Sequence, residues 1–327
     1  MRNLDSSDTI AAIATPPGEG GIGIVRISGK DACRIADRLF IAKGGKKPSE
    51  CNTFTMHYGW VVAGSLPVRQ AGRPQAPGSK KVSSKQRVSP PEKFIDEVIL
   101  TVMKAPRTYT KEDIVEINCH GGFLALRSVL DLVVTYGARL AEPGEFTKRA
   151  FLNGRIDLAQ AEAVVDVIRA KTEAALLMGA AQLRGGLSRA VHKIRKVLLR
   201  ALSMLEANID FPDEGQDFEV ARLLQDLTRA KRELGNMLDS SKTAKVLREG
   251  VHVVICGKPN VGKSSLLNAF LREERSIVTP IAGTTRDTIE EIIDLRGIPM
   301  RIVDTAGILE PRDLIEKKAV LRSKQHI

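Results

Sequence analysis

The sequence predicts a multidomain protein, with an α+β domain over residues 1–152, an α-helical domain over residues 153–247 and a partial α/β domain over residues 248–327. Three changes of pattern along the chain predict this division. Short β-rich runs separated by glycines and prolines extend to Leu152, helical periodicity follows, and a strand, a glycine-rich loop and a helix come after Gly250. A chain of 327 residues is long enough to bury two or three separate cores.

The first part shows the mixed pattern of an α+β domain. Runs rich in Ile and Val predict strands over residues 22–28, 97–103 and 114–119. A longer apolar segment over residues 123–136 has helical spacing. Glycines and prolines punctuate these segments, as is typical of short strands joined by turns.

A basic insertion separates two predicted strands, one within residues 53–62 and the other within residues 96–104, which is the strand placed above at 97–103. Residues 64–93 contain seven Lys or Arg and one acidic residue, so they supply more than half of the net charge of +11. Their proline, glycine and serine content leaves little to bury and indicates a disordered, flexible loop. Two interpretations stay open for this segment, a solvated loop and an arm that contacts RNA.

The second part is predicted to be helical throughout. Asp157 and Gln160 form a helix start signal. Apolar residues then recur on one helical face, at Leu158, Ala161, Val165 and Ile168. Pro212 and Gly215 interrupt the long helices, which resume over residues 220–238.

Composition argues against several classes of protein. No apolar run reaches the length of about 18 residues that a membrane span needs, so we expect no membrane association. The first residues lack a basic head followed by an apolar core, which predicts no export signal. The cysteines lack disulfide or metal-ligand spacing and fit a reducing cytoplasm; they are Cys33, Cys51, Cys119 and Cys256.

The third part carries the most specific motif in the chain. The sequence "GKPNVGKS", residues 257–264, fits the phosphate-binding pattern GxxxxGKS. It follows the predicted strand 252–256 and precedes the predicted helix 265–271, which is the context that the motif requires. Lys263 is expected to contact the β and γ phosphates, and the Ser264 hydroxyl to bind Mg²⁺.

Two downstream motifs indicate a GTPase. In "GTTRDT", residues 283–288, Thr285 is placed to meet both Mg²⁺ and the γ-phosphate. In "IVDTAG", residues 302–307, Asp304 can hold Mg²⁺ through water, and the Gly307 N–H can contact the γ-phosphate. The residues between the motifs predict two strands about a turn at Arg296 and Gly297.

The hydrolytic machinery departs from that of Ras-like enzymes, which place a water-orienting glutamine after this aspartate motif. The chain has Ile308 there, so another group must orient water and another cation must stabilise the transition state. The amide oxygen of Asn260 could help bind a monovalent cation. Glu316 could act through water, or it could be a solvated residue of a predicted helix.

These residues together resemble one family, the tRNA modification GTPase MnmE, also called TrmE. The resemblance covers the chain apart from the basic insertion. It includes the segments "DTIAAIATPPGEGGIGIVRISG", "PRTYTKEDIVEINCHGG", "PGEFTKRAFLNGRIDLAQAEAVVDVIRAKT", "IDFPDEG" and "GKPNVGKSSLLNAF". This combination is far more specific than a phosphate-binding loop alone.

The resemblance implies a folate-binding-like N-terminal domain that forms homodimers and binds a 5-formyltetrahydrofolate-type one-carbon donor. Arg26, Glu116 and Arg155 match the family's folate-site positions. From the residues alone, Glu116 and Arg155 could equally form a surface ion pair. The resemblance also implies a cytoplasmic protein that forms a heterotetramer with the flavoprotein MnmG. Together they would add an aminomethyl or carboxymethylaminomethyl group to C5 of the wobble uridine of tRNA.

For the third part, the resemblance implies a G domain inserted into the helical domain. K⁺ would stimulate its GTP hydrolysis by taking the place that an arginine finger has in other GTPases. Glu316 would serve hydrolysis together with Arg286 and Asp287. The K⁺ ligands would be Asn260, Thr279, Ile281 and Thr284, and the Mg²⁺ ligands Ser264 and Thr285. The GTP-binding residues would be Asn260, Val261, Gly262, Lys263, Ser264, Ser265, Thr279, Pro280, Ile281, Ala282, Gly283, Thr284, Thr285, Asp304, Thr305, Ala306 and Gly307.

The chain also departs from the family pattern, since no guanine-reading NKxD motif follows "DTAG". Guanine specificity thus comes from the resemblance alone, and we expect an exposed sheet edge beside the strands at 253–256 and 300–304. One alternative is therefore a catalytically inert folate-binding dimer or assembly module. A ribosome-associated, RNA-binding GTPase is another, although the folate-site residues argue against it.

Overall fold

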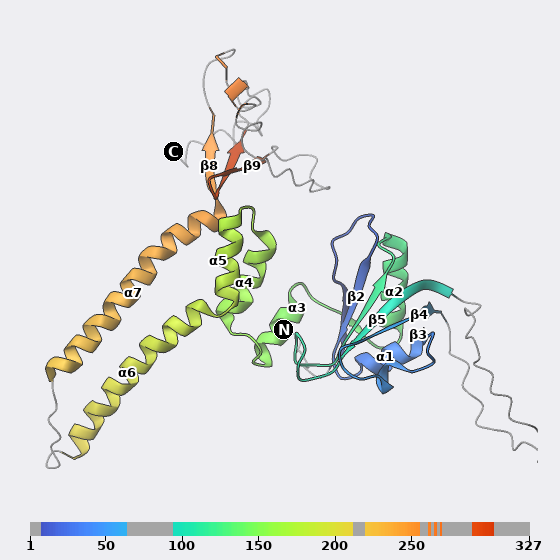
Figure 1. Ribbon diagram of the computed structural model, residues 1–327, viewed down its shortest axis with the longest axis horizontal. Coiled ribbons are helices and arrows are strands. Elements are labelled where there is room, and N and C mark those ends of the chain that lie inside the picture. The colour runs from blue at the N-terminus through green and yellow to red at the C-terminus, as the bar shows by residue number, and fades with distance from the viewer. Residues whose placement is uncertain are drawn as a thin grey trace, which may run out of the picture. The chain divides into compact units, whose positions relative to one another are not determined.

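The computed structural model describes residues 8–63, 94–211, 220–255, 261–262, 265–266, 269 and 290–303 (Figure 1). The chain divides into two compact units, residues 1–156 and 157–327. Within the described ranges, no helix has both the length and the apolar character that crossing a bilayer requires.

The first unit is built on one seven-stranded sheet with the order β3-β4-β5-β6-β2-β1-β7. Neighbouring strands are antiparallel except for the β1–β7 pair, which is parallel. The strands are β1 (Ile10–Ile13), β2 (Gly23–Ser28), β3 (Phe40–Ala42), β4 (Thr55–Val62), β5 (Phe94–Met103), β6 (Ile114–Cys119) and β7 (Arg139–Leu140). The strands predicted near residues 22–28, 53–62, 97–103 and 114–119 are confirmed.

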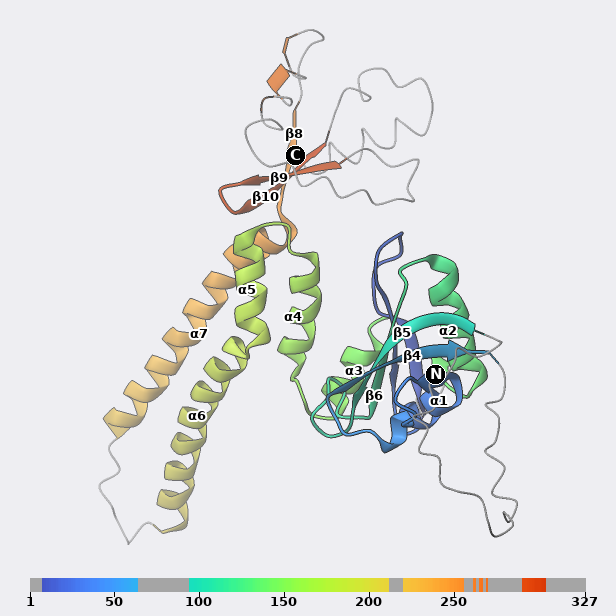
Figure 2. The same cartoon turned by 45° about the vertical axis from the view of Figure 1, so that its right-hand side comes forward.

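Helices α1 (Ala32–Leu39) and α2 (Phe123–Thr135) pack on one face of this sheet (Figure 2). Alternate strand residues such as Val25, Leu100 and Ile117 point into the core between them and are fully buried. A short 3₁₀ helix (Pro48–Glu50) and helix α3 (Glu145–Leu152) complete the unit. The opposite face of the sheet is open to solvent over β4 and β5, where Met56, Tyr58 and Ile99 are exposed.

The second unit begins with four helices: α4 (Leu158–Arg169), α5 (Glu173–Leu183), α6 (Gly186–Asp210) and α7 (Val220–Glu249). The predicted start signal is confirmed as a capping box, since the Asp157 side chain accepts from the Gln160 N–H and the Gln160 side chain accepts from the Asp157 N–H. Helices α6 and α7 form a long antiparallel pair (Figures 1 and 2).

Helix α4 packs against α5, but not through the apolar face that the sequence predicted. Two residues of that face, Leu158 and Ile168, are 61% and 75% exposed to solvent. The two helices instead approach through small residues, because Ala163 is fully buried and a Cβ at Gly179 would lie 3.0 Å from Cγ2 of Val167. Close helix approach selects small side chains, and periodicity of large residues does not reveal it.

A three-stranded sheet with the order β8-β10-β9 follows α7. Strand β8 (Val251–Val254) is parallel to β10 (Ile298–Val303), and β10 is antiparallel to β9 (Glu290–Leu295). The predicted turn between β9 and β10 is confirmed, with φ angles of 53° at Arg296 and 90° at Gly297. This turn packs on the start of α5, since a Cβ at Gly297 would lie 3.2 Å from that of Ala174.

Candidate functional site

Arg26 and Glu116 form an ion pair on the open face of the first sheet. They are cross-strand neighbours in the β2–β6 register, and Nε of Arg26 lies 2.7 Å from Oε1 of Glu116. Their side chains are 30% and 21% exposed. A guanidinium and a carboxylate held half-buried on a rigid sheet remain accessible to a ligand that has both acidic and N–H groups.

The sheet register places this pair in a row with residues of two more strands. Glu116 is opposite Thr101 of β5, and Thr101 is opposite Met56 of β4. In the next row, Ile99 is opposite the exposed Tyr58. The ion pair therefore adjoins an exposed apolar surface on the same face of the sheet.

Helix α3 borders the pair and links it to the third predicted residue. The Arg26 guanidinium lies 5.7 Å from the ring centroid of Phe146. The next residue, Thr147, is hydrogen-bonded through Oγ1 to the hydroxyl of Tyr109 at 2.9 Å. Arg155 lies over that tyrosine, 4.8 Å from its ring centroid. Helix α3 thus contacts Arg26 directly through Phe146 and is linked to Arg155 through Thr147 and Tyr109.

The loop that carries Arg155 is tied down by polar contacts. Nδ2 of Asn153 donates to the carbonyl of Thr110 at 2.6 Å, and Nζ of Lys111 donates to the carbonyl of Gly154 at 3.0 Å. The Arg155 N–H donates to the carbonyl of Ala150. These bonds anchor the loop to the turn that precedes β6.

The alternative in which Glu116 and Arg155 form a surface ion pair is wrong. Glu116 pairs with Arg26 instead, and Arg155 stacks on Tyr109. The reason is the antiparallel register of β2 and β6, which sets residues 26 and 116 directly opposite each other.

A partly buried network of charges, centred on the buried Glu145 and Arg149, holds α3 in place, and sequence reasoning missed it. Arg139 makes two contacts with Glu145, at 2.6 and 3.0 Å, and its Nε lies 2.7 Å from Oδ2 of Asp8. Arg149 contacts Asp8, Glu145 at 3.2 Å and Glu112 at 3.1 Å. The network joins the start of the chain, the turn before β6 and α3, all of which surround the candidate site.

Electrostatics within this network favour the ionised carboxylates. Burial by itself raises the pKa of Glu145, but hydrogen bonds from Arg139, from the Glu142 N–H and from Arg149 lower it to about 2. The pKa of Asp8 is lowered for the same reason, by Arg139 and Arg149 acting against desolvation. The spacing of Glu145 and Arg149, four residues apart, was the one local signal for this network.

The predicted nucleotide loop is described only in part. Strand β8 ends at Val254, Gly262 has a φ of +97°, and the Leu266 N–H donates to the Gly262 carbonyl at 2.9 Å. A left-handed glycine followed by a helical hydrogen bond is consistent with a strand–loop–helix phosphate site. Strand β10 ends at Val303, immediately before Asp304 of the "IVDTAG" motif.

Of the predicted GTP-binding residues, Val261, Gly262 and Ser265 are described. The other predicted residues of the nucleotide and cation sites lie outside the described residues. They are Asn260, Lys263, Ser264, Thr279, Pro280, Ile281, Ala282, Gly283, Thr284, Thr285, Arg286, Asp287, Asp304, Thr305, Ala306, Gly307 and Glu316. Among the residues that are described, no group of three or more His, Cys, Asp or Glu could hold a metal ion.

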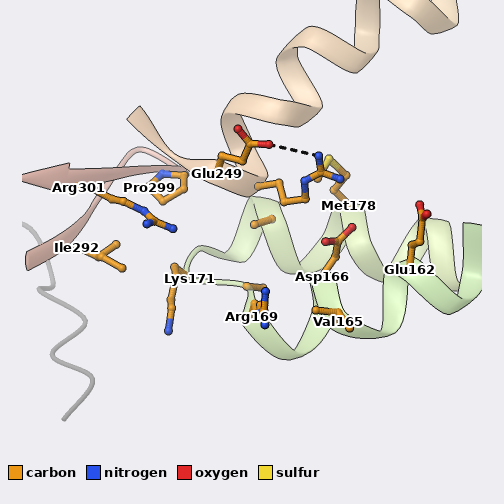
Figure 3. A pocket seen from close by; sticks show the side chains of 13 residues that line it. Glu162, Val165, Asp166, Arg169, Lys171, Met178, Glu249, Ile292, Pro299 and Arg301 are labelled. Carbon is orange, nitrogen blue, oxygen red and sulfur yellow. Dashed lines mark hydrogen bonds and ion pairs between the residues drawn. The ribbon is translucent and has the colours of Figure 1, made fainter. Parts of the chain in front are cut away.

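A cavity of about 860 Å³ lies in the second unit, where α4, α5 and the end of α7 meet strands β9 and β10 (Figure 3). Its lining mixes charges of both signs, including Asp166, Lys171, Glu249 and Arg301. The described residues that line it include none of those predicted to bind nucleotide.

Comparison with known proteins decides the family. The model described as the N-terminus of the GTP-binding protein TrmE matches residues 9–155, and the model described as the MnmE helical domain matches residues 158–326. The chain belongs to the MnmE (TrmE) family. The predicted fold class of an N-terminal α+β domain, a helical domain and a partial G domain is thereby confirmed.

Individual MnmE proteins are similar over nearly the whole chain. Proteins named tRNA modification GTPase MnmE from Lysinibacillus sphaericus and Bacillus subtilis are 49% and 48% identical over 320 residues, and one from Alkaliphilus oremlandii is 50% identical over the same length. These alignments cover 97% of this chain and 64% of each relative. The chain thus spans slightly less than two thirds of the length of the MnmE proteins it matches.

Proposed function

We propose that this protein is the GTP-hydrolysing component of a tRNA-modifying enzyme of the cytoplasm. The observation that carries the proposal is the similarity of 97% of the chain to proteins named tRNA modification GTPases, at 48–50% identity. The phosphate-binding motif at residues 257–264 supplies the matching chemistry.

In this proposal the nucleotide site works by positioning and by charge. Lys263 neutralises the β and γ phosphates, while Ser264 and Thr285 hold Mg²⁺. Asn260 contributes to a K⁺ site whose cation offsets the negative charge of the transition state. Glu316 orients the attacking water, since Ile308 has no group that could do so.

The test is GTP hydrolysis in KCl compared with NaCl at equal ionic strength. We expect faster turnover in KCl, because a site built from an amide oxygen and loop carbonyls selects the larger cation by fit. Asn260→Ala should remove the difference between the two salts while leaving measurable nucleotide binding. Equal rates in both salts would contradict the K⁺ assignment, and an absence of turnover in both would favour an inert folate-binding or assembly module.

The first unit is proposed to bind a 5-formyltetrahydrofolate-type one-carbon donor, which would supply the carbon added at C5 of the wobble uridine. Its residues fit such a ligand: Glu116 offers a carboxylate to the N–H edge of a pterin, and Arg26 and Arg155 offer guanidinium groups to the carboxylates of the glutamate tail. Phe146 and Tyr109 add aromatic surface beside both arginines. The flavoprotein MnmG is the proposed partner in a heterotetramer.

A homodimer is part of the same proposal. The exposed apolar side chains Met56, Tyr58 and Ile99 lie on the sheet face that also carries the Arg26–Glu116 pair. An exposed apolar patch beside a polar site is typical of a surface that another protein covers. Dimer formation through this face would enclose the proposed folate site.

Charge reversal at the ion pair is expected to weaken folate binding. Arg26→Glu or Glu116→Lys should each lower the affinity for 5-formyltetrahydrofolate at least tenfold, since a charged hydrogen bond contributes about 1.5–3 kcal/mol. Isothermal titration calorimetry measures the change. The matched control is Arg34→Glu. Arg34 lies on α1 and forms an exposed ion pair with Asp31, so its replacement should leave the affinity for folate unchanged. Unchanged affinity in both site variants would remove the folate assignment.

A further inference from the structure

A second cavity in the helical part of the second unit has a strongly cationic lining. It has a volume of about 530 Å³ and lies where the start of α4, the end of α5 and the first turns of α6 meet. Four of its residues are cations: Arg184, Arg189, Lys193 and Lys196. Among the described residues that line it, Asp157 alone is acidic. This lining is unlike that of the larger cavity, which mixes both signs.

The helix period explains why these cations gather. Arg189, Lys193 and Lys196 are spaced by four and three residues on α6, so they lie on one side of that helix. Arg184 joins them because α5 ends there and Gly185, with a φ of +78°, turns the chain into α6. Arg200 continues the same spacing, which extends the row to about 16 Å, the length of several phosphates along one nucleic-acid strand.

The carboxylate of Asp157 offsets at most one of the four positive charges, and hydrogen bonds fix it at the start of α4. Asp157 accepts a hydrogen bond from the Gln160 N–H at 2.9 Å. A hydrogen bond from Ser188 is the main cause that lowers the pKa of Asp157. Both interactions hold the carboxylate in place at the edge of the cavity.

Most of the cationic charge is left without an acidic partner. Lys193 lies 3.2 Å from Glu233, but that carboxylate also pairs with Arg229 at 3.4 Å. Nη1 of Arg189 donates to the carbonyl of Arg184 at 2.5 Å, which orients its guanidinium without neutralising it. Within the described part of the chain, neither Arg184 nor Lys196 forms an ion pair with an acid. Asp157 and the shared Glu233 offset only part of the charge of the four clustered cations, so the surface keeps an excess of positive charge that favours an anion.

We propose that this cavity binds the phosphate backbone of RNA. The inference rests on the proposed function, since tRNA would be the RNA in question, and it names the surface of this chain that would hold it. The lining residues favour nucleic acid over an acidic protein, because all are polar or charged except Gly185. A protein interface needs an apolar centre, whereas phosphate binding needs cations and hydrogen-bond donors.

The test is the affinity of the full chain for fluorescently labelled tRNA, measured by anisotropy between 50 and 200 mM KCl, a range in which phosphate contacts are strongly salt-dependent. The site variant is Arg184→Gln/Lys196→Gln. The control variant, Arg222→Gln/Lys242→Gln, removes one Arg and one Lys from α7 and leaves the same net charge. Circular dichroism melting checks that both variants fold.

The site variant is expected to bind tRNA about tenfold or more weakly at 0.1 M salt, and the slope of log K against log salt should fall by about 1 for each residue. The control variant should match the parent in both quantities. Unrelated RNA of equal length should show the same loss, because phosphate contacts carry no sequence information.

Three outcomes overturn the inference: an affinity and slope unchanged in the site variant, an equal loss in the control variant, or displacement of tRNA by polyglutamate as readily as by polyuridylate. The last would indicate an acidic protein partner.

GTP hydrolysis is measured on the same preparations. If hydrolysis is present and the tRNA effect is absent, the inference fails alone; if hydrolysis is absent and the site variant loses tRNA, the proposed GTPase function fails and the inference stands.

Discussion

Replacing Lys263 with alanine is expected to lower the affinity for GTP by about 10- to 100-fold and to remove GTP turnover. In the motif at residues 257–264 this lysine supplies a point charge to the β and γ oxygens of the nucleotide. A charged hydrogen bond of this kind contributes about 1.5–3 kcal/mol, which corresponds to that range of affinity. Titration with a mant-labelled guanine nucleotide measures the loss.

The matched control for this variant is Lys231→Ala, which removes an exposed lysine from α7 and should leave the affinity within about twofold of the parent, as exposed charges contribute little. The same titration with a mant-labelled adenine nucleotide tests guanine specificity, which rests on family resemblance. Equal affinities of parent and Lys263→Ala would show that the motif does not bind phosphate in this protein.

Replacing Arg149 with methionine is expected to destabilise the first unit by about 3–5 kcal/mol. The arginine side chain is 6% exposed and contacts Asp8, Glu112 and Glu145. Methionine fills much of the same volume but removes this partner from the buried Glu145 and from Glu112, which is 15% exposed, and removing one partner of a buried ion pair is costly. Urea unfolding followed by fluorescence measures the effect, because the only tryptophan, Trp60, lies in β4 of this unit.

The control is Arg127→Met on α2. Arg127 pairs with Asp131, four residues along the same helix, and both side chains are more than 60% exposed. Its removal should cost less than about 1 kcal/mol. The Arg149 variant should also bind folate more weakly, since α3 carries Phe146 beside Arg26. A loss in stability no larger than that of the control would show that the network does not hold α3 in place.

Features that depend on neighbours in the chain were predictable from the sequence. The capping box at Asp157 and Gln160, the long strands of the first sheet and the turn at Arg296 and Gly297 all appear where the pattern placed them. Such features depend on contacts within a few residues, so local sequence contains their causes. Family resemblance, carried by motifs spread along the chain, added the candidate site residues.

Contacts between distant segments were decided only by the tertiary structure. Arg26 and Glu116 are 90 residues apart and meet because of the β2–β6 register, and Arg149 reaches Asp8 across 141 residues. The contact of α4 with α5 likewise depends on Ala163 and Gly179, which allow close approach, and not on the large apolar residues that periodicity selects. A sequence pattern states which side chains share a face or a strand, but the partner of that face depends on how sheet register and helix packing join remote segments.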